Sequence, residues 1–257
     1  MNLILVAHGT RKPEGVVMIG QIAERVGELL QQVVRTAFVD VLGPTPGEVL
    51  AATADDGRPA VVVPGFLSRG YHVRADLPVH VAASGHPDVT VTPALGPGPE
   101  LTRVVAARLV ESGWRSGDSV ILAAAGTSDP AGREDLRHAA QLLSGLIRSD
   151  IEVAFAATGE PSVTDAVATL RGRRAHRVVV ASYLLADGLF QQRLRAAGAD
   201  LVTDPLGSHP DIAQLIADRF TRARALTPVG SGLFGDSEQQ GGVLERTDRV
   251  DRGGHHQ

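Results

Sequence analysis

Apolar runs alternate with amphipathic segments along most of this chain. Short runs rich in valine, isoleucine and leucine predict β-strands at 2–7, 36–41, 59–64, 88–92, 119–124, 151–157, 176–182 and 200–203. Between them, apolar residues at helical spacing predict helices at 14–34, 45–54, 75–85, 98–112, 131–148, 162–172, 188–198 and 209–224. The strand runs are mostly apolar throughout, which is typical of strands covered on both faces. The pattern predicts an α/β fold with parallel sheets and right-handed crossovers.

The alternation occurs twice, because the second part of the chain repeats the first. A shift of 117 residues places Phe38 on Phe155 and Pro44 on Pro161. We therefore predict a first α/β half at 1–113 and a second α/β half at 118–224. From 225 to 257 the chain is rich in glycine, glutamine and charges without an apolar period, which predicts a disordered tail.

Three polar residues of the first half are apolar at the matching positions of the second half. The pairs are His8 with Ala125, Asp40 with Ala157 and His72 with Leu189. His8 follows the first predicted strand, Asp40 closes the second, and His72 lies in the loop after the third. Because ligands bind beyond the carboxyl ends of parallel strands, we expect all three at one edge of the first sheet. This arrangement predicts a single, asymmetric active site.

The chemistry of this trio suits a divalent metal. Two imidazoles and a carboxylate can bind Fe(II) or Co(II), and imidazoles with pKa values near neutrality can also accept protons. We therefore predict that His8, Asp40 and His72 are both metal ligands and catalytic residues.

Basic and flexible residues gather near the same edge. Arginine side chains pair well with carboxylates or phosphates, a glycine-containing loop can flex over a ligand, and a tyrosine can lie against a flat ring. The substrate-binding candidates are Arg11, Ser68, Arg69, Gly70, Tyr71 and Arg74.

Composition excludes several classes of protein. The 257 residues include no cysteine, so disulfides, thiolate zinc sites, cysteine nucleophiles and self-bound iron–sulfur clusters are ruled out. A formal net charge of −4 argues against broad nucleic-acid binding. No apolar run approaches the ~18 residues of a membrane span, and the start of the chain carries no signal-peptide pattern. We expect a cytoplasmic protein without a membrane partner.

The segment Ala7-His8-Gly9-Thr10 is similar to the Arg-His-Gly signature of histidine phosphatases. Ala7 stands where that signature has its arginine, which disfavours a phosphoester hydrolase. No nucleophile elbow, Walker loop or His-Glu-x-x-His motif is present.

Taken together, four segments resemble the small class II chelatases of the sirohydrochlorin chelatase family. They are LILVAHGTR at 3–11, AFVD at 37–40 followed by Pro44-Thr45, PGFLSRGYHVRADLP at 64–78, and LGPGPEL at 95–101. The first and third in this order are fairly specific, and with the second half the resemblance extends to about residue 224. The family includes the cobaltochelatase of the early-insertion cobalamin route and the ferrochelatase of siroheme synthesis.

The resemblance implies a lyase that inserts a divalent metal into a sirohydrochlorin-type tetrapyrrole held in the cleft between two α/β halves. It also implies that His8 and His72 are metal ligands and proton acceptors. At two positions the chain departs from the family: Asp40 replaces the usual glutamate, and Gly43 replaces a glutamate that the second half retains as Glu160.

In that interpretation the metal is a substrate, and no cofactor is bound permanently. We favour Fe(II), giving siroheme, because cobalt-associated tail motifs are absent; Co(II), for cobalamin precursors, remains open. A duplicated chain forms its cleft internally, so we expect a monomer. The alternative is a non-catalytic tetrapyrrole or metal carrier.

Overall fold

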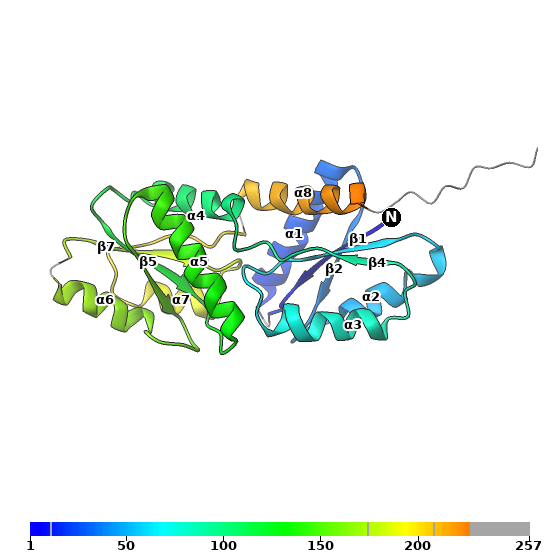
Figure 1. The fold of residues 1–257 in the computed structure, drawn as a ribbon, viewed down its shortest axis with the longest axis horizontal. Helices are drawn as coiled ribbons and strands as arrows, with labels where there is room; N and C mark the ends of the chain where they lie inside the picture. The colour runs from blue at the N-terminus through cyan, green and yellow to red at the C-terminus, as the bar shows by residue number, and fades with distance from the viewer. Residues whose placement is uncertain (11, 174, 208, 227–257) are drawn as a thin grey trace, which may run out of the picture. The chain divides into compact units, whose positions relative to one another are not determined.

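Two separate sheets of four parallel strands form the framework of the protein in the computed structural model (Figure 1). The first sheet has the order β2-β1-β3-β4, with β1 (Asn2–Ala7), β2 (Val34–Phe38), β3 (Ala60–Pro64) and β4 (Val89–Val91). The second has the matching order β6-β5-β7-β8, with β5 (Ser119–Ala124), β6 (Ile151–Phe155), β7 (Val178–Tyr183) and β8 (Leu201–Val202). The α/β class and the two similar parallel sheets predicted from the sequence are thereby confirmed.

The structure describes residues 1–10, 12–173, 175–207 and 209–226. Met1–Leu226 forms one compact unit. Of the predicted tail, residues 225–226 belong to the last helix and the remainder lies outside the described residues, as does Arg11. None of the described helices is long and apolar enough to cross a membrane.

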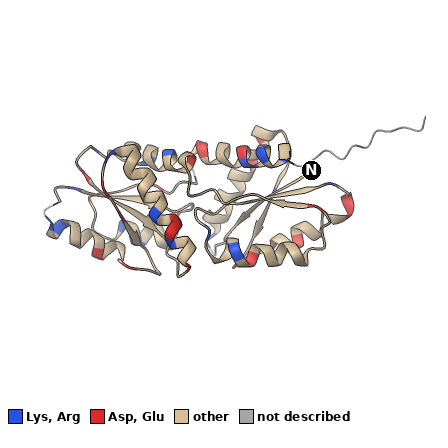
Figure 2. Cartoon of the chain, viewed as in Figure 1, with Lys and Arg blue, Asp and Glu red and all other residues tan. Residues whose placement is uncertain are grey.

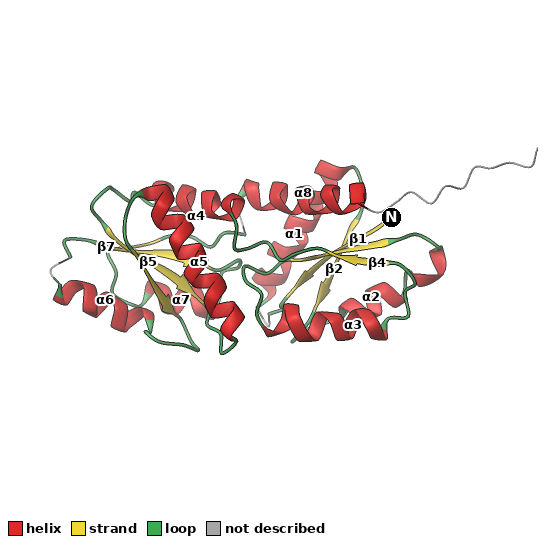
Figure 3. Cartoon of the chain, in the orientation of Figure 1, coloured by secondary structure: helices red, strands yellow, loops and turns green. Residues whose placement is uncertain are grey.

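Helices cover both faces of each sheet (Figure 3). They are α1 (Pro13–Leu30), α2 (Pro46–Ala51), η1 (Ala54–Asp56, 3₁₀), η2 (His72–Asp76, a π-helix), α3 (Leu77–Ala83), α4 (Pro99–Glu111), α5 (Pro130–Ile147), α6 (Val163–Gly172), α7 (Leu189–Arg195) and α8 (Pro210–Leu226). The strands are almost free of charged residues, which lie on helices and loops (Figure 2).

Two predicted boundaries near the site were wrong. The helix predicted to 34 ends at Leu30, because Gln31 takes a left-handed conformation with φ of 54°, and β2 then begins at Val34. Asp40 therefore lies two residues beyond its strand instead of closing it. His72 is not in a loop: it begins the π-helix η2, which continues directly into α3.

The last helix of each repeat packs on the sheet of the other repeat. By sequence α4 ends the first half, yet it contacts α5 and β7; α8 ends the second half, yet it contacts α1 and β3. Figure 1 shows α8 lying over the first sheet, beside α1. The segment 112–118 thus joins two sequence repeats that exchange a helix in space.

This exchange unites the cores of the two repeats. One apolar cluster contains Leu3 and Leu5 of β1, Leu122 of β5, Leu109 of α4 and Phe220 of α8, each at most 1% exposed. Separate clusters fill the opposite faces, under α2 and α3 for the first sheet and under α6 and α7 for the second. Because burying a large aliphatic side chain stabilises a fold by roughly 1.5–3 kcal/mol, both faces of each sheet contribute to stability.

Candidate metal and substrate site

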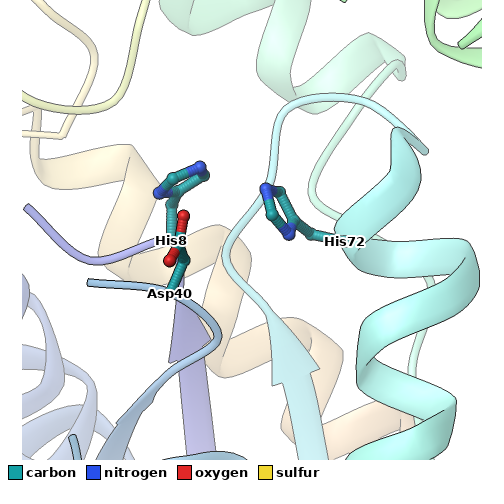
Figure 4. A group of neighbouring side chains, drawn as sticks. All are labelled: His8, Asp40 and His72. Atoms are coloured by element: carbon teal, nitrogen blue, oxygen red, sulfur yellow. The ribbon is translucent and has the colours of Figure 1, made fainter. Parts of the chain in front are cut away.

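His8, Asp40 and His72 come together at the carboxyl edge of the first sheet (Figure 4). Each offers one ligand atom, and these atoms all lie within 4.8 Å of one another. His8 directly follows β1, Asp40 lies in the turn after β2, and His72 begins η2. The side chains of His8 and Asp40 are exposed and His72 is half-buried, so the cluster is open to ligands.

Backbone geometry brings Asp40 beside His8. The Asp40 amide donates to the His8 carbonyl at 3.0 Å, which extends the pairing of β1 with β2 beyond the strands. Gly9 has φ of 91°, and a Cβ at this position would overlap the Asp40 carbonyl oxygen. The Asp40 carboxylate also accepts a hydrogen bond from the Val41 amide at 2.7 Å. Glycine is therefore required at position 9 for the close approach of the two chain segments.

The two imidazoles meet edge to face, with ring centroids 4.5 Å apart. His8 Nδ1 is 3.2 Å from the Gly9 carbonyl oxygen, and His72 Nδ1 is 2.5 Å from Asp76 Oδ2. A neutral imidazole that donates from Nδ1 to such an acceptor has its lone pair on Nε2, where it can bind an ion. Asp76 was missed in the sequence, although its position four residues after His72 on a helical segment was an available signal.

An apolar cavity of about 580 Å³ adjoins the cluster between the two sheets. The equivalent strand ends of both repeats line it, at 7–10 and 124–127, and His8 stands at its border. Apolar side chains dominate the remaining wall: Phe66, Leu67, Leu136, Leu184, Leu189 and Phe190. Its size and lining suit an organic ligand with a large apolar face.

A second cavity, of about 550 Å³, also adjoins the cluster. It is lined by Asp40, His72, Asp76 and His80 together with Val39, Tyr71 and Val79. None of the described residues lines both cavities. The trio is therefore divided between the two cavities: His8 lines the apolar one, and Asp40 and His72 line the polar one.

Arg69 joins the segment before His72 to the second half. Its guanidinium contacts the Asp135 carboxylate at 2.6 Å and its amide donates to the same group at 2.7 Å. Asp135 is only 2% exposed, and its hydrogen bonds and charge raise the pKa of Arg69. The Arg69 guanidinium therefore holds a buried carboxylate of α5.

Two further contacts lie on either side of this segment. Arg74 pairs with Asp129, the N-cap of α5, at 3.0 Å. The Tyr183 hydroxyl donates to the Leu67 carbonyl at 2.9 Å, and burial raises the pKa of Tyr183 so that this hydroxyl stays protonated. Together with the Arg69–Asp135 pair, these contacts join residues 67–74 to the second half.

Two of the remaining described candidates line the cavities. Ser68 lines the apolar cavity, while Tyr71 lines the polar one, is 64% exposed, and has its ring 6.1 Å from that of His72. Gly70 is half-buried. His209 Nε2 lies 3.6 Å from a Glu111 carboxylate oxygen, where α8 begins and α4 ends.

Comparisons with known proteins agree with this architecture. The family model described as CbiX matches the chain twice, over residues 2–112 and 119–223. The sirohydrochlorin ferrochelatase of Priestia megaterium is 25% identical over 232 residues, which cover 84% of this chain and 87% of that protein. The sirohydrochlorin cobaltochelatase of Methanopyrus kandleri is 36% identical over 78 residues, covering 30% of this chain and 54% of that protein.

Solved structures share the fold. SirB from Bacillus subtilis with Fe³⁺ superposes with a TM-score of 0.76 at 20% identity, covering 88% of this chain and 96% of SirB. A CbiX structure, described as the terminal enzyme for biosynthesis of siroheme in denitrifying bacteria, superposes with a TM-score of 0.66 at 23% identity, covering 87% of this chain and 99% of its own.

Proposed function

The chain belongs to the CbiX family, and on this basis we propose that it is a sirohydrochlorin chelatase, which inserts a divalent metal into a tetrapyrrole. One observation carries the proposal: two imidazoles and a carboxylate converge at the border of a large apolar cavity. The name of the Priestia megaterium relative, which aligns over most of both chains, supports the same activity.

The reaction exchanges one divalent cation for two pyrrole protons. We propose that His8, Asp40 and His72 hold the incoming ion through ligands that leave easily. As the four ring nitrogens replace these ligands, the released imidazoles accept the two protons, which balances the charge of the inserted metal. The apolar cavity would hold the macrocycle against its wall, where the second half contributes Leu184, Leu189 and Phe190.

The carboxylates of sirohydrochlorin need cationic or donor partners at the rim of the cavity. We propose Arg11, Ser68, Gly70 and Tyr71 as neighbours of these groups. Arg69 and Arg74 stay candidates as well, because their side chains are 59% and 56% exposed while they hold Asp135 and Asp129. A guanidinium has five N–H donors, so one carboxylate partner does not exhaust it.

Iron is the physiological metal that we propose, with siroheme as the product. Its support is the ferrochelatase name of the relative that aligns over 84% of this chain, whereas the cobaltochelatase relatives align over 30%. The ligand set itself accepts either ion, since Fe(II) and Co(II) both bind imidazole and carboxylate.

An insertion assay tests the function directly. The purified protein, incubated anaerobically with sirohydrochlorin and Fe(II) or Co(II), should change the macrocycle absorbance well above the spontaneous rate and through many turnovers. A carrier would instead bind one equivalent of macrocycle or metal and leave the insertion rate unchanged. A higher kcat/KM for Co(II) than for Fe(II) would contradict iron as the proposed metal.

Asp76 offers a milder test of how His72 is held. Asp76→Ala removes the acceptor of His72 Nδ1, so we expect Co(II) affinity in the free protein to fall about 10–100-fold, with partial recovery in Asp76→Asn. Titration of the Co(II) absorption bands measures this. Asp55→Asn, which alters an exposed carboxylate of η1, is the control. Wild-type affinity in Asp76→Ala would show that this contact does not orient the ring.

A further inference from the structure

The second half carries a cation at the place that matches the metal cluster. The shift of 117 residues between the repeats places Asp76, the partner of His72, on Arg193 of α7. The Arg193 guanidinium donates to the Ala156 carbonyl, just beyond β6, at 3.2 Å and lies 5.9 Å from the centroid of the Phe190 ring. Phe190 lines the apolar cavity. Where the first half gathers groups that attract a cation, the second half therefore presents a cation of its own.

A second guanidinium is tied to the same edge of the second sheet. Arg133, in the first turn of α5, donates from Nε to the Thr127 carbonyl at 3.1 Å, and Thr127 lines the apolar cavity. Arg133 and Arg193, which we call the arginine pair, are both exposed and have no carboxylate partner among the residues that the structure describes. A guanidinium has five N–H donors, so each can still bind a carboxylate through two parallel hydrogen bonds.

A buried polar network holds the helix that carries Arg193. Gln191 of α7 is 0% exposed; its side chain accepts a hydrogen bond from the Ser182 hydroxyl at 2.6 Å and donates to the Thr203 carbonyl at 2.8 Å. Because an unsatisfied buried amide is costly, these bonds fix α7 on the second sheet. Phe190 and Arg193 flank Gln191 on this short helix, so the apolar wall and the cation beside it are held together before a ligand binds.

Other charges near this cavity are already paired. Arg69 and Arg74 of the first half hold carboxylates of α5 and its N-cap. Asp187 lines the cavity, but its carboxylate is paired with Arg195 at 2.9 Å. The arginine pair therefore adds positive charge that no carboxylate of the described residues offsets.

We propose that the arginine pair binds peripheral carboxylates of the tetrapyrrole, so that the second half recognises the charge of the substrate as well as its apolar face. This inference rests on the proposed chelatase function. A macrocycle in the apolar cavity would lie against Phe190, and its carboxylates would extend from the ring edge towards the guanidinium groups. The first half then acts on the ring nitrogens, while the second half fixes the orientation of the ring through its periphery.

Arg133→Met and Arg193→Met test the site, because methionine keeps an unbranched apolar stem and removes the charge. We expect the KM for sirohydrochlorin to rise about fivefold in each variant, the upper range for an exposed ion pair, and about 25-fold in the double variant. The kcat and the KM for Co(II) should stay within about twofold of wild type, because the metal trio is untouched. Arg193→Lys, which keeps the charge without the planar fork, should restore part of the affinity.

Arg137→Met is the matched control. Arg137 lies four residues after Arg133 on the same helix, is exposed, and is paired with Glu134. Its replacement removes the same charge one turn further from the strand ends, so we expect the KM for sirohydrochlorin to stay at the wild-type value. The methyl ester of sirohydrochlorin gives a control on the ligand, because it keeps the ring and lacks the charges. Its dissociation constant, measured by absorbance titration, should be the same in wild type and in the double variant.

Three results would overturn the inference. A wild-type KM for sirohydrochlorin in the double variant would mean that the arginine pair does not bind the substrate. An equal loss of affinity for the free acid and the ester would mean that the pair only supports the cavity wall. A lower kcat and melting temperature with an unchanged KM would assign it to stability alone. Failure of the proposed function looks different, because the wild-type protein would then not accelerate insertion, while titration with the free acid would still report the effect of each arginine.

Discussion

Alanine in place of His8 or His72 is expected to lower the rate of metal insertion into sirohydrochlorin at least about 100-fold. Each substitution removes an ion ligand and a proton acceptor together, and positioned proton transfer alone contributes about 10²–10⁴-fold to a rate. The neighbouring imidazole cannot replace the lost one, because its ring is held edge-on at 4.5 Å by its own Nδ1 contact.

Two measurements separate the two roles of each histidine. Co(II) titration without macrocycle reports ligand loss, and the single-turnover rate at saturating Co(II) reports proton transfer. His138→Ala, at an exposed histidine of α5, should leave both unchanged. Wild-type insertion rates in His8→Ala or His72→Ala would remove these residues from the mechanism, whatever the metal.

Arg69→Met is expected to destabilise the protein by about 3 kcal/mol. The substitution leaves the Asp135 carboxylate, 2% exposed, without its cation, and an uncompensated buried charge is costly. For a chain of this size such a loss corresponds to a fall in melting temperature of roughly 6–12 °C. Arg173→Met, which breaks the exposed pair with Glu152, is the control and should cost at most about 1 kcal/mol.

The double variant Arg69→Met/Asp135→Leu distinguishes stability from positioning. Replacing both partners of a buried pair by apolar residues is often neutral, so we expect most of the lost stability to return. Insertion activity should stay low, because the contact of Arg69 with Asp135 no longer holds the segment before His72 against α5. Full recovery of activity together with stability would mean that the pair only stabilises the fold.

The features that could be predicted from the sequence are those that depend on local residue patterns. Strand runs such as 2–7 and 119–124 are mostly apolar, and the repeat predicts two similar sheets, which the structure has in matching strand order. The trio followed from the rule that ligand-binding groups lie beyond strand ends, and the structure brings its members together. Even so, Asp40 lies two residues beyond β2, because this strand ends at Phe38 and not at residue 41 as predicted.

Contacts between distant segments could not be predicted from the local sequence pattern. Arg69 and Asp135 are 66 residues apart, and nothing around Asp135 marks it as different from the other charges of an amphipathic helix. The same holds for Tyr183, whose hydroxyl reaches the Leu67 carbonyl. The exchange of α4 and α8 is equally invisible, since each helix has an ordinary apolar face that would fit either sheet.

That exchange has a consequence for how such a protein can arise. A chain with one repeat that kept this arrangement would cover one side of its own sheet only in part, with α1, and would complete the cover with the last helix of a twin. Two identical chains would then carry two identical clusters around one shared space. Fusing the genes keeps the exchange within one polypeptide, so one copy is free to lose its histidines and become the wall that receives the other's ligand. In this protein Ala125 and Leu189 stand at the positions that match His8 and His72, and both line the apolar cavity.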